Sequence, residues 1–337
     1  MKTLRAVEFK DDKLFFINQT KLPFTQEIIS SDEYERIALA IERLEIRGAP
    51  AIGVAAAFAL ALSIKNISEE KCNTVFEKAY NRLKSTRPTA VNLFYALNEI
   101  QSVFEHSKTK NNIYLSLISK AVELQNTDII LCDRIANNGL EIINKKSSVL
   151  THCNTGFLAT GGNGTALNVI RNAFEKGMIE HVYVDETRPL FQGSRLTAWE
   201  LNKLEIPFLI ITDSTSGYLM QQNKIDLAIV GADRIASNGD TANKIGTYNV
   251  AVLCQYHKIP FYIAAPSTTI DRNCEDGTKI KIENRSPHEL TRINESRITL
   301  DNYPAFCPAF DVTPNKLITA FITEKEVYKP PYNFKNV

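Results

Sequence analysis

The chain has 337 residues, of which 44% are hydrophobic and 23% charged, as in ordinary soluble globular proteins. This length is sufficient for two domains, each with its own core. The 39 basic and 38 acidic side chains nearly cancel, which leaves a formal net charge of +1. Such a balance produces no long-range field for nucleic acid or an anionic membrane, so we expect neither partner.

The six cysteines are scattered, and no Cys-x-x-Cys pair or short Cys/His spacing suggests zinc. The N-terminal residues MKTLRAVEFKDDK carry charges throughout and lack the apolar stretch of a signal peptide. The longest uncharged apolar run, residues 49–64, is shorter than the roughly 20 residues of a membrane span and indicates a buried helix. We therefore expect a cytoplasmic chain with reduced thiols and no bound metal.

The first third of the chain predicts a small, mainly helical domain with a minor antiparallel sheet. Residues 9–18 are typical of two strands joined by a turn at the paired aspartates. Residues 31–44 show helical spacing behind a Ser-Asp-Glu start, and Pro50 suits the start of the next helix. Further helical patterns occupy residues 69–83, 91–106 and 113–144. We assign residues 1–125 to this domain.

From about residue 147, short β-rich runs alternate with helical stretches. The β-rich runs are SSVLTHC, HVYVDE, PFLIITD, DLAIVGAD, PFYIAAP and KLITAFIT. The helical stretches are residues 165–176, 194–204 and 246–257. This alternation predicts βαβ units, and hence an α/β fold in which a Rossmann-like catalytic domain with a parallel sheet spans residues 126–337.

Polar and reactive residues concentrate where the predicted strands end, which is where ligands bind in open α/β sheets. Cys153 ends the first of these strands. A lone cysteine is usually an inert buried residue, so its position alone does not establish catalysis. His152 resembles a ready base for it, but neighbours on a strand point to opposite faces, which favours a structural role for His152.

A glycine-containing segment, THCNTGFLATGGNGTALNVIR, leads from this strand into a helix. Glycines before a helix start suit anion binding, although they also simply shape loops. A dinucleotide fingerprint is the rival interpretation, since Asp185 follows Gly164 at about the required spacing of 20 residues. That fingerprint needs its glycines at the strand end, whereas Gly161 lies eight positions beyond Cys153, which disfavours an NAD-dependent dehydrogenase.

Asp233 lies at the sheet rim in the block GADR, and Asn243 and Lys244 follow before the helix from Gly246. For an isolated Asp-Arg pair, a loop salt bridge is the ordinary interpretation. Asn243 and Lys244 at a helix start suit anion or hydroxyl binding better than core packing.

Two arginines of the first domain, Arg47 in RGAP and Arg87 in TRPT, each stand beside a proline-led helix start. An arginine fork next to helix N–H groups is a good phosphate clamp, and a surface ion pair is the alternative for each.

In combination, these blocks resemble the methylthioribose-1-phosphate isomerases, the aldose–ketose isomerase branch of the initiation-factor-2B-like family. The resemblance runs in order from about residue 40 to 325, through IRGAPAIGVAAAFALAL, TRPTAVNLFYAL, the glycine segment, VYVDETRPLFQGSRLTAWEL, GADRIASNGDTANKIGTY and PAFDVTP. It implies that Cys153 and Asp233 are the catalytic pair. It also implies substrate contacts by Arg47, Gly48, Ala49, Arg87, Gln192, Asn243 and Lys244.

The implied reaction converts 5-methylthioribose 1-phosphate to 5-methylthioribulose 1-phosphate in methionine salvage. A sugar phosphorylated on its anomeric carbon does not open spontaneously, so we expect Asp233 to protonate the ring oxygen. Cys153 would then act as a thiolate base through an enediolate-like species, or stabilise a hydride shift in a dry pocket. No cofactor is expected, because isomerisation is balanced in electrons. The resemblance further implies a homodimer.

Two other functions stay open. One is isomerisation of a related anomeric phosphate, such as 5-deoxyribose 1-phosphate or ribose 1,5-bisphosphate. The other is a non-catalytic regulatory subunit of the initiation-factor type, which the intact THCN and GADR blocks disfavour. Cys307 stands where the family has asparagine, and Asn163 and Asn168 replace an aromatic residue and a glycine. These departures leave the catalytic pair intact and bear on substrate preference.

Overall fold

The computed structural model describes residues 5–87, 90–107, 112–293 and 296–335. The chain divides into two compact units, called here the helical unit (Met1–Arg134 with Thr155–Asn168) and the sheet unit (Ile135–Asn154 with Val169–Val337). The division after Arg134 falls inside a helix, α5 (Ile113–Gly139). The domain boundary between residues 125 and 126 stays a prediction.

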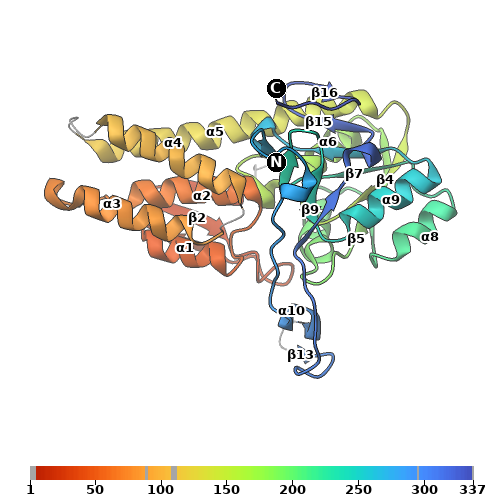
Figure 1. Cartoon of the computed structure of the whole chain (residues 1–337), viewed down its shortest axis with the longest axis horizontal. Coiled ribbons are helices and arrows are strands. Elements are labelled where there is room, and N and C mark those ends of the chain that lie inside the picture. The colour runs from red at the N-terminus through yellow and green to blue at the C-terminus, as the bar shows by residue number, and fades with distance from the viewer. Residues whose placement is uncertain (1–4, 88–89, 108–111, 294–295, 336–337) are drawn as a thin grey trace. The chain divides into compact units, whose positions relative to one another are not determined.

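In its described residues, the helical unit contains one small antiparallel sheet and five α-helices, the last of which continues into the sheet unit (Figure 1). The sheet has the order β1 (Val7–Lys10), β2 (Lys13–Ile17), β3 (Ile28–Ser31). The helices are α1 (Tyr34–Glu42), α2 (Ala49–Leu62), α3 (Glu69–Lys84), α4 (Val91–Ser107) and α5. The expected mainly helical domain with a minor antiparallel sheet is confirmed.

Two local expectations for this unit have different outcomes. The turn at the paired aspartates is confirmed, since Asp11 and Asp12 have φ angles of 50° and 55° between β1 and β2. The helix expected from residue 31 begins only at Tyr34. Ser31 instead belongs to β3, a strand that the sequence did not predict, and pairs there with Leu14 of β2.

The apolar run from residue 49 is the buried helix that its composition predicted. Every residue of α2 from Ala51 to Leu62 is buried. Gly53 permits the close approach of α4, since a Cβ there would lie 2.8 Å from the carbonyl oxygen of Asn92. No helix among the described residues is both long enough and apolar enough to cross a membrane.

The sheet unit is built on a seven-stranded sheet. Its order is β16 (Val327–Tyr328), β15 (Ala320–Ile322), β10 (Phe261–Ala264), β7 (Leu227–Val230), β4 (Ser147–Thr151), β5 (Ile179–Asp185), β6 (Phe208–Ile211). Among these described strands the neighbours are parallel, apart from the antiparallel pair β15–β16. The six β-rich runs thus form the expected parallel sheet.

The helices that follow these strands are α6 (Ala166–Glu175), α7 (Ala198–Lys203), α8 (Thr215–Gln221) and α9 (Thr247–His257). A π-helical turn, Gly193–Thr197, leads into α7. The sequence predicted these helices apart from α8, which is only seven residues long.

A second, four-stranded sheet was not predicted. Its order is β11 (Ile270–Asp271), β8 (Arg234–Ala236), β9 (Thr241–Lys244), β14 (Phe310–Thr313). Asn243 and Lys244 therefore end a strand, and α9 begins only at Thr247 after the N-cap Gly246. The expected position of these two residues at a helix start is wrong.

The strand order of the large sheet reverses between β4 and β7. From β4 the chain proceeds through β5 to the edge strand β6, and then returns to β7 on the other side of β4. Leu150 of β4 is in register with Ala228 of β7. Ligands of open α/β sheets bind beyond the carboxyl ends of the strands at such a reversal, so the topology itself predicts where the site lies.

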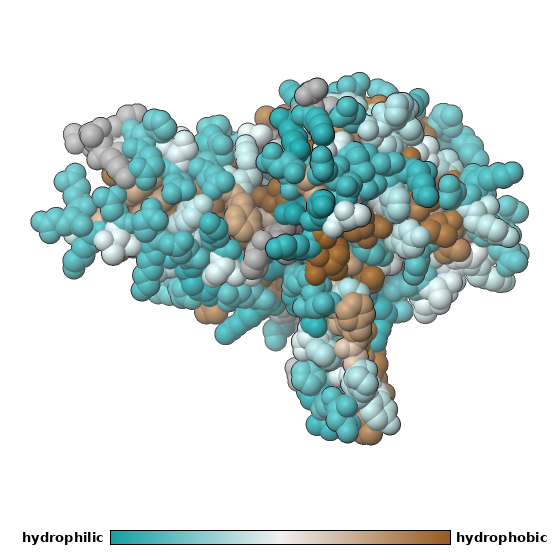
Figure 2. Space-filling model, in the orientation of Figure 1, coloured by the Kyte–Doolittle hydropathy of each residue, from teal (hydrophilic) through white to brown (hydrophobic). Residues whose placement is uncertain are grey.

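One segment projects from the body of the sheet unit, as Figure 1 shows. It carries α10 (His288–Thr291), β12 (Arg292–Ile293) and β13 (Ser296–Arg297). At its base Arg285 N–H donates to the carbonyl oxygen of Cys307. Figure 2 shows hydrophobic colours along this segment, which exposes Ile298, Leu300, Tyr303 and Phe306.

Candidate functional site

Cys153 and Asp233 follow the two strands between which the sheet order reverses. Cys153 lies two residues beyond the end of β4, and Asp233 lies three residues beyond the end of β7. Because β4 and β7 are parallel neighbours, both segments leave the sheet at the same edge. The sheet unit thus brings the two residues of the predicted catalytic pair to adjacent strand ends.

The backbone at Cys153 is held in an unusual conformation. Its φ is 64°, in the left-handed region that residues other than glycine rarely adopt. Cys153 N–H donates to Thr187 Oγ1 at 2.9 Å, and its carbonyl oxygen accepts from Thr197 Oγ1 at 2.6 Å. The side chain is buried. Non-glycine residues in such conformations concentrate at functional sites, where the surrounding structure enforces them.

Gln192 is positioned by a close contact between the π-helical turn and the end of β5. A Cβ on Gly193 would overlap the carbonyl oxygen of Asp185, so only glycine allows this approach. Gln192 immediately precedes that glycine and is 5% exposed. Its Oε1 has no hydrogen-bond partner among the described residues. A buried acceptor of this kind is suited to a ligand hydroxyl.

Asp233, Asn243 and Lys244 are organised by the smaller sheet. Asp233 N–H donates to the carbonyl oxygen of Ala242 at 2.9 Å. Asn243 is buried and donates through Nδ2 to Thr247 Oγ1 at 3.0 Å. Lys244 Nζ lies 4.9 Å from the centre of the Phe310 ring. The antiparallel pairing of β8 with β9 thus keeps Asp233 beside the strand that carries the two predicted substrate contacts.

His152 is fully buried beside Cys153. Its Nδ1 lies 3.0 Å from Asp185 Oδ2, and its Nε2 lies 2.9 Å from the carbonyl oxygen of Ile245. Burial lowers the pKa of His152, but the hydrogen bond and charge of Asp185, together with Asp213 and the Ile245 carbonyl, outweigh it, so the pKa is raised. Burial also raises the pKa of Asp185 to about 6. The sequence predicted a structural role for His152 but not these partners.

His152 and Asp185 also belong to a cluster of three side chains of the types that bind metal ions. Within the described part of the chain, His152, Asp185 and Asp213 offer one ligand atom each, within 4.8 Å of one another. Both carboxylate oxygens of Asp213 already accept backbone N–H groups, from Thr187 at 2.7 Å and Arg188 at 2.8 Å. His152 Nδ1 is likewise engaged by Asp185. Apart from Asp185 Oδ1, which has no hydrogen-bond partner among the described residues, the ring and carboxylate atoms of this group are engaged in internal hydrogen bonds.

The other predicted substrate contacts lie in the helical unit. Arg47 and Gly48 precede α2, and Ala49 is its first residue. Gly48 has a φ of 91°, and a Cβ there would overlap Ala159 of the glycine segment. Arg87 precedes α4, and the neighbouring Pro88 and Thr89 of the TRPT motif lie outside the described residues. Gly48 thus joins the start of α2 to the segment that follows Cys153 in the chain.

The glycine segment packs on α5. Gly161 N–H donates to Asp128 Oδ2 at 2.6 Å, and a Cβ on Gly162 would lie 2.8 Å from Ile129 Cα. Burial raises the pKa of Asp128 to about 6. Because the Gly161 N–H is taken and these glycines are buried, they serve close packing, and the anion-binding interpretation of this turn loses its support.

The departures from the family pattern at Asn163 and Asn168 form one cluster. Asn163 Nδ2 donates to Asp133 Oδ1 at 2.9 Å. Asn168 Nδ2 lies 3.5 Å from the same oxygen and donates to the carbonyl oxygen of Cys132 at 3.1 Å. Both asparagines thus bind α5 and fasten the glycine segment from its far end.

Arg188 is a residue near the strand ends that the sequence reasoning did not select. Its Nη1 is buried and has no hydrogen-bond partner among the described residues, and its guanidinium lies 5.1 Å from the centre of the Phe191 ring. Its position three residues beyond the end of β5, in the block DETRP, was the available signal. Thr187 lies in the same block, whereas Thr197, which also holds Cys153, had no signal of this kind.

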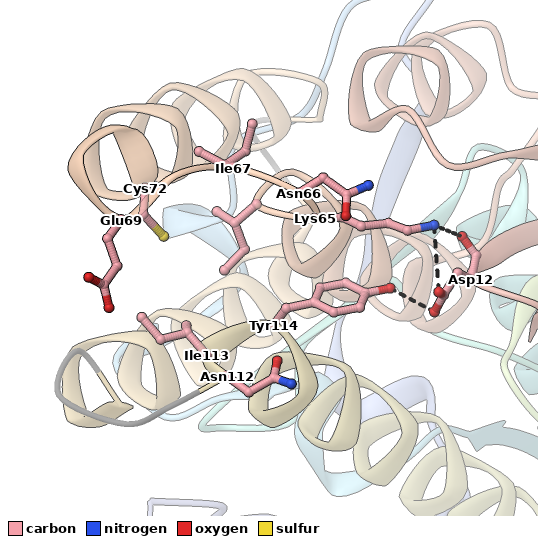
Figure 3. A pocket seen from close by; sticks show the side chains of 10 residues that line it. Asp12, Lys65, Asn66, Ile67, Glu69, Cys72, Asn112, Ile113 and Tyr114 are labelled. Carbon is pink, nitrogen blue, oxygen red and sulfur yellow. Dashed lines mark hydrogen bonds and ion pairs between the residues drawn. The ribbon is translucent and has the colours of Figure 1, made fainter.

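A pocket of about 420 Å³ lies elsewhere, in the helical unit (Figure 3). Asp12 accepts a hydrogen bond from Tyr114 and forms an ion pair with Lys65, and Cys72 and Glu69 line the opposite side. None of the predicted site residues lines this pocket. Two of its charged residues, Asp12 and Lys65, are paired with each other.

Comparison with known proteins identifies the family. The model of the initiation factor 2 subunit family matches residues 45–330. A curated methylthioribose-1-phosphate isomerase from Caldicellulosiruptor saccharolyticus is 48% identical over 332 residues, which cover 98% of this chain and 97% of that protein.

Two solved structures are similar over nearly the whole chain. The 5-methylthioribose 1-phosphate isomerase of Pyrococcus horikoshii OT3 has a TM-score of 0.93 at 42% identity, covering 98% of this chain and 94% of that one. A protein described as translation initiation factor eIF-2B, subunit delta, from A. fulgidus has a TM-score of 0.87 at 40% identity, covering 98% and 97%. This chain therefore belongs to the initiation factor 2 subunit family and, within it, to the methylthioribose-1-phosphate isomerases.

Proposed function

We propose that this chain converts 5-methylthioribose 1-phosphate to 5-methylthioribulose 1-phosphate, a step of methionine salvage. Relatives that are 44% to 48% identical over nearly the full chain carry this isomerase name. The observation that carries the proposal is the adjacency of β4 and β7 at the reversal of strand order, since Cys153 and Asp233 follow these strands.

In the proposed mechanism, Asp233 opens the sugar ring. Its carboxyl proton passes to the ring oxygen as the bond between that oxygen and C1 breaks, because the 1-phosphate prevents opening to a free aldehyde. Hydrogen then moves from C2 to C1, and the proton of the C2 hydroxyl is released as the ketone forms. The carboxylate of Asp233 is the group that accepts this proton and restores the starting state.

Cys153 takes part in the transfer between C2 and C1. As a thiolate it would remove the C2 proton and return it to C1, or it would stabilise a direct hydride shift. The burial of its side chain supports either route, because both require that water be excluded. Its left-handed backbone, held by Thr187 and Thr197, supports a functional role for the residue.

Substrate contacts are proposed in both units. In the sheet unit, the orphaned Oε1 of Gln192 suits a sugar hydroxyl, and Lys244 suits the phosphate. In the helical unit, Arg47, Gly48 and Ala49 at the start of α2, together with Arg87, keep the substrate-binding role that the resemblance implies. The backbone N–H groups at the start of α2 favour an anion.

Turnover of three sugar 1-phosphates tests the proposal. Purified protein should isomerise 5-methylthioribose 1-phosphate faster than 5-deoxyribose 1-phosphate or ribose 1,5-bisphosphate. Cys153→Ser and Asp233→Asn should each lower kcat by about 100-fold or more. Cys72→Ser and Asp226→Asn are matched controls. Cys72 lies in α3 of the helical unit. Asp226 forms an ion pair with Lys145 at the amino-terminal ends of β7 and β4, away from the strand ends that precede Cys153 and Asp233. Near-normal turnover by both site variants would exclude the assigned pair.

Two alternatives are decided by the same assay. A faster rate with either other sugar phosphate would indicate an isomerase of a related anomeric phosphate. The similarity to the A. fulgidus protein favours a non-catalytic initiation-factor subunit as second candidate. That candidate predicts no turnover of any of the three substrates by a folded protein.

We also propose a cytoplasmic homodimer with a Rossmann-like sheet unit. The reversal of order among six parallel strands supports the Rossmann-like assignment. For the dimer, the support is a group of exposed apolar side chains on the packed helices α8 and α9 and on the edge strand β6. This group, called here the dimer face, consists of Leu209, Ile210, Tyr218, Tyr248, Val252 and Tyr256.

A further inference from the structure

The ring of His152 links two segments that carry predicted site residues. His152 directly precedes Cys153, and Ile245, whose carbonyl oxygen lies 2.9 Å from Nε2, directly follows Lys244. The ring also packs on Gly246, where a Cβ would lie 2.9 Å from His152 Cε1. Through this single side chain, the end of β4 is fastened to the turn between β9 and α9.

The partners of the ring define its protons. A carbonyl oxygen only accepts, so Nε2 must carry a hydrogen to bond Ile245. Nδ1 faces the carboxylate of Asp185 at 3.0 Å, and with Asp185 ionised this nitrogen must also donate. The imidazolium and the carboxylate then form a neutral pair with both ring hydrogen bonds made. If the ring loses one proton, either the hydrogen bond to Ile245 is lost or the bare Nδ1 faces the carboxylate of Asp185, so that two lone pairs oppose each other.

The charged groups around His152 favour the doubly protonated form of its ring. Carboxylates act on the ring from three elements, namely Asp185 at the end of β5, Asp213 after β6 and Asp311 in β14. Asp311 caps α9 by accepting from the N–H groups of Gly246 and Tyr248. Cys254 of α9 interacts with Asp185, and burial raises the pKa of this thiol to about 12, so it adds no charge at neutral pH.

We propose that His152 is a positioning residue: its doubly protonated ring, paired with Asp185, holds the turn after Lys244 at a set distance from β4 and so places Lys244 relative to Cys153. His152 itself does not touch the substrate. This assignment rests on the proposed isomerase function, because it is that reaction which needs a phosphate contact and a thiol in fixed relation.

The pair makes substrate binding sensitive to high pH. A histidine whose pKa is raised in the folded state stabilises its contacts below its ordinary value of 6.5 and loses that contribution as the pH rises through the folded value. The apparent KM of the wild-type protein should therefore rise on the alkaline side, with a smaller change in kcat.

Two substitutions separate positioning from general stability. His152→Gln bonds only one of the two partners, so we expect KM to rise about tenfold at neutral pH with kcat changed less. Asp185→Asn permits both bonds without the titrating proton, since the amide nitrogen that it introduces donates to Nδ1 while Nε2–H keeps Ile245. Asp185→Asn should keep KM within about twofold of the wild type and abolish the alkaline rise. An unchanged KM in His152→Gln, or an alkaline rise retained in Asp185→Asn, overturns the assignment.

Nitrogen-15 NMR of the histidine rings provides a measurement that needs no substrate. The chain has five histidines, and His152→Gln identifies the signal by its loss. In the wild type at neutral pH, both ring nitrogens of His152 should be protonated, and in Asp185→Asn only Nε2. A singly protonated ring in the wild type refutes the inference even if the isomerase assay succeeds. Absence of turnover with a doubly protonated ring refutes the proposed function instead.

Discussion

At the scale of single residues, the buried side chain of Gln192 lowers the stability of the fold and is also proposed to bind the substrate. Its Oε1 is buried without a partner among the described residues, which costs on the order of 1–3 kcal/mol. Gln192→Leu removes that cost and also removes the proposed substrate acceptor. We expect KM to rise about tenfold while the melting temperature stays equal or increases. Gln222→Leu, at an exposed position after α8, is the control. A KM that does not rise in Gln192→Leu would contradict a binding role.

The sequence located the residue after β4 but not the contacts that hold it. Cys153 could be placed at a strand end because an apolar run stops there. Thr187 and Thr197 lie 34 and 44 positions away in the chain, and they reach Cys153 only because β5 folds beside β4. The sequence favoured a structural role for His152, which stays a prediction, but its partners Asp185 and Ile245 depend on how two sheets meet. Pairings of this kind carry no local pattern.

At the scale of elements, the π-helical turn depends on one glycine. A Cβ on Gly193 would overlap the carbonyl oxygen of Asp185, so Gly193→Ala must shift the turn that carries Gln192. We expect a loss of about 2 kcal/mol or more in the free energy of unfolding, measured with urea, and a higher KM. Gly217→Ala in α8 is the matched control. Its nearest neighbour would lie at 3.4 Å, and alanine stabilises a helix by roughly 0.5–1 kcal/mol relative to glycine.

The attachment of the glycine segment to α5 should depend on pH. Burial raises the pKa of Asp128 from 3.8 to about 6, so the folded state binds more protons than the unfolded state between these values. Stability contributed by this proton is therefore lost as the pH rises from about 4 to above 6. In Asp128→Asn, the difference in unfolding free energy between pH 4 and pH 7 should change by about 2 kcal/mol relative to the wild type.

The control for this measurement is Glu141→Gln, at an exposed position after α5, which should keep the wild-type pH dependence. Asp185 shows the same direction of shift, so part of the dependence persists in Asp128→Asn. An unaltered difference between the two pH values in Asp128→Asn would mean that this carboxyl does not take up a proton on folding.

Short elements were the main part of the fold that the sequence did not reveal. The six strands of the large sheet are apolar runs with clear boundaries. By contrast, β8 and β9 have three and four residues and contain Arg234 and Lys244, so neither shows a strand pattern. On its other side β9 pairs with β14, about 70 positions later in the chain. Because β9 shows no strand pattern of its own, Lys244 was expected at the start of the helix that follows it.

At the scale of the whole molecule, contacts divide the chain where its sequence shows no boundary. Residues 155–168 belong to the helical unit although they follow β4 of the sheet unit. Gly48, Asp128 and Asp133 hold them there through contacts that span 30 positions or more in the chain. Composition and strand–helix alternation predicted two regions of different architecture, but they could not assign an inserted segment that lacks a pattern of its own.

Association of two copies through the dimer face is a prediction at this scale. Tyr248, Val252 and Tyr256 recur every four residues along α9, which puts them on one side of that helix. Their exposure leaves an apolar stripe on α9, which packs against α8, and contiguous exposed apolar patches mark association surfaces. A charge placed in the stripe would have to be desolvated when two copies meet, which is costly.

Val252→Asp should therefore convert a dimer into a monomer, or raise the dissociation constant by about 100-fold or more, as measured by light scattering after size-exclusion chromatography. Val122→Asp on α5 is the matched control, because the two valines are 38% and 37% exposed and receive the same charge. The control should keep the wild-type mass, since it lies outside the dimer face. Equal masses for both variants would show that α9 is not the contact, and a wild type that is monomeric at all concentrations would exclude the homodimer itself.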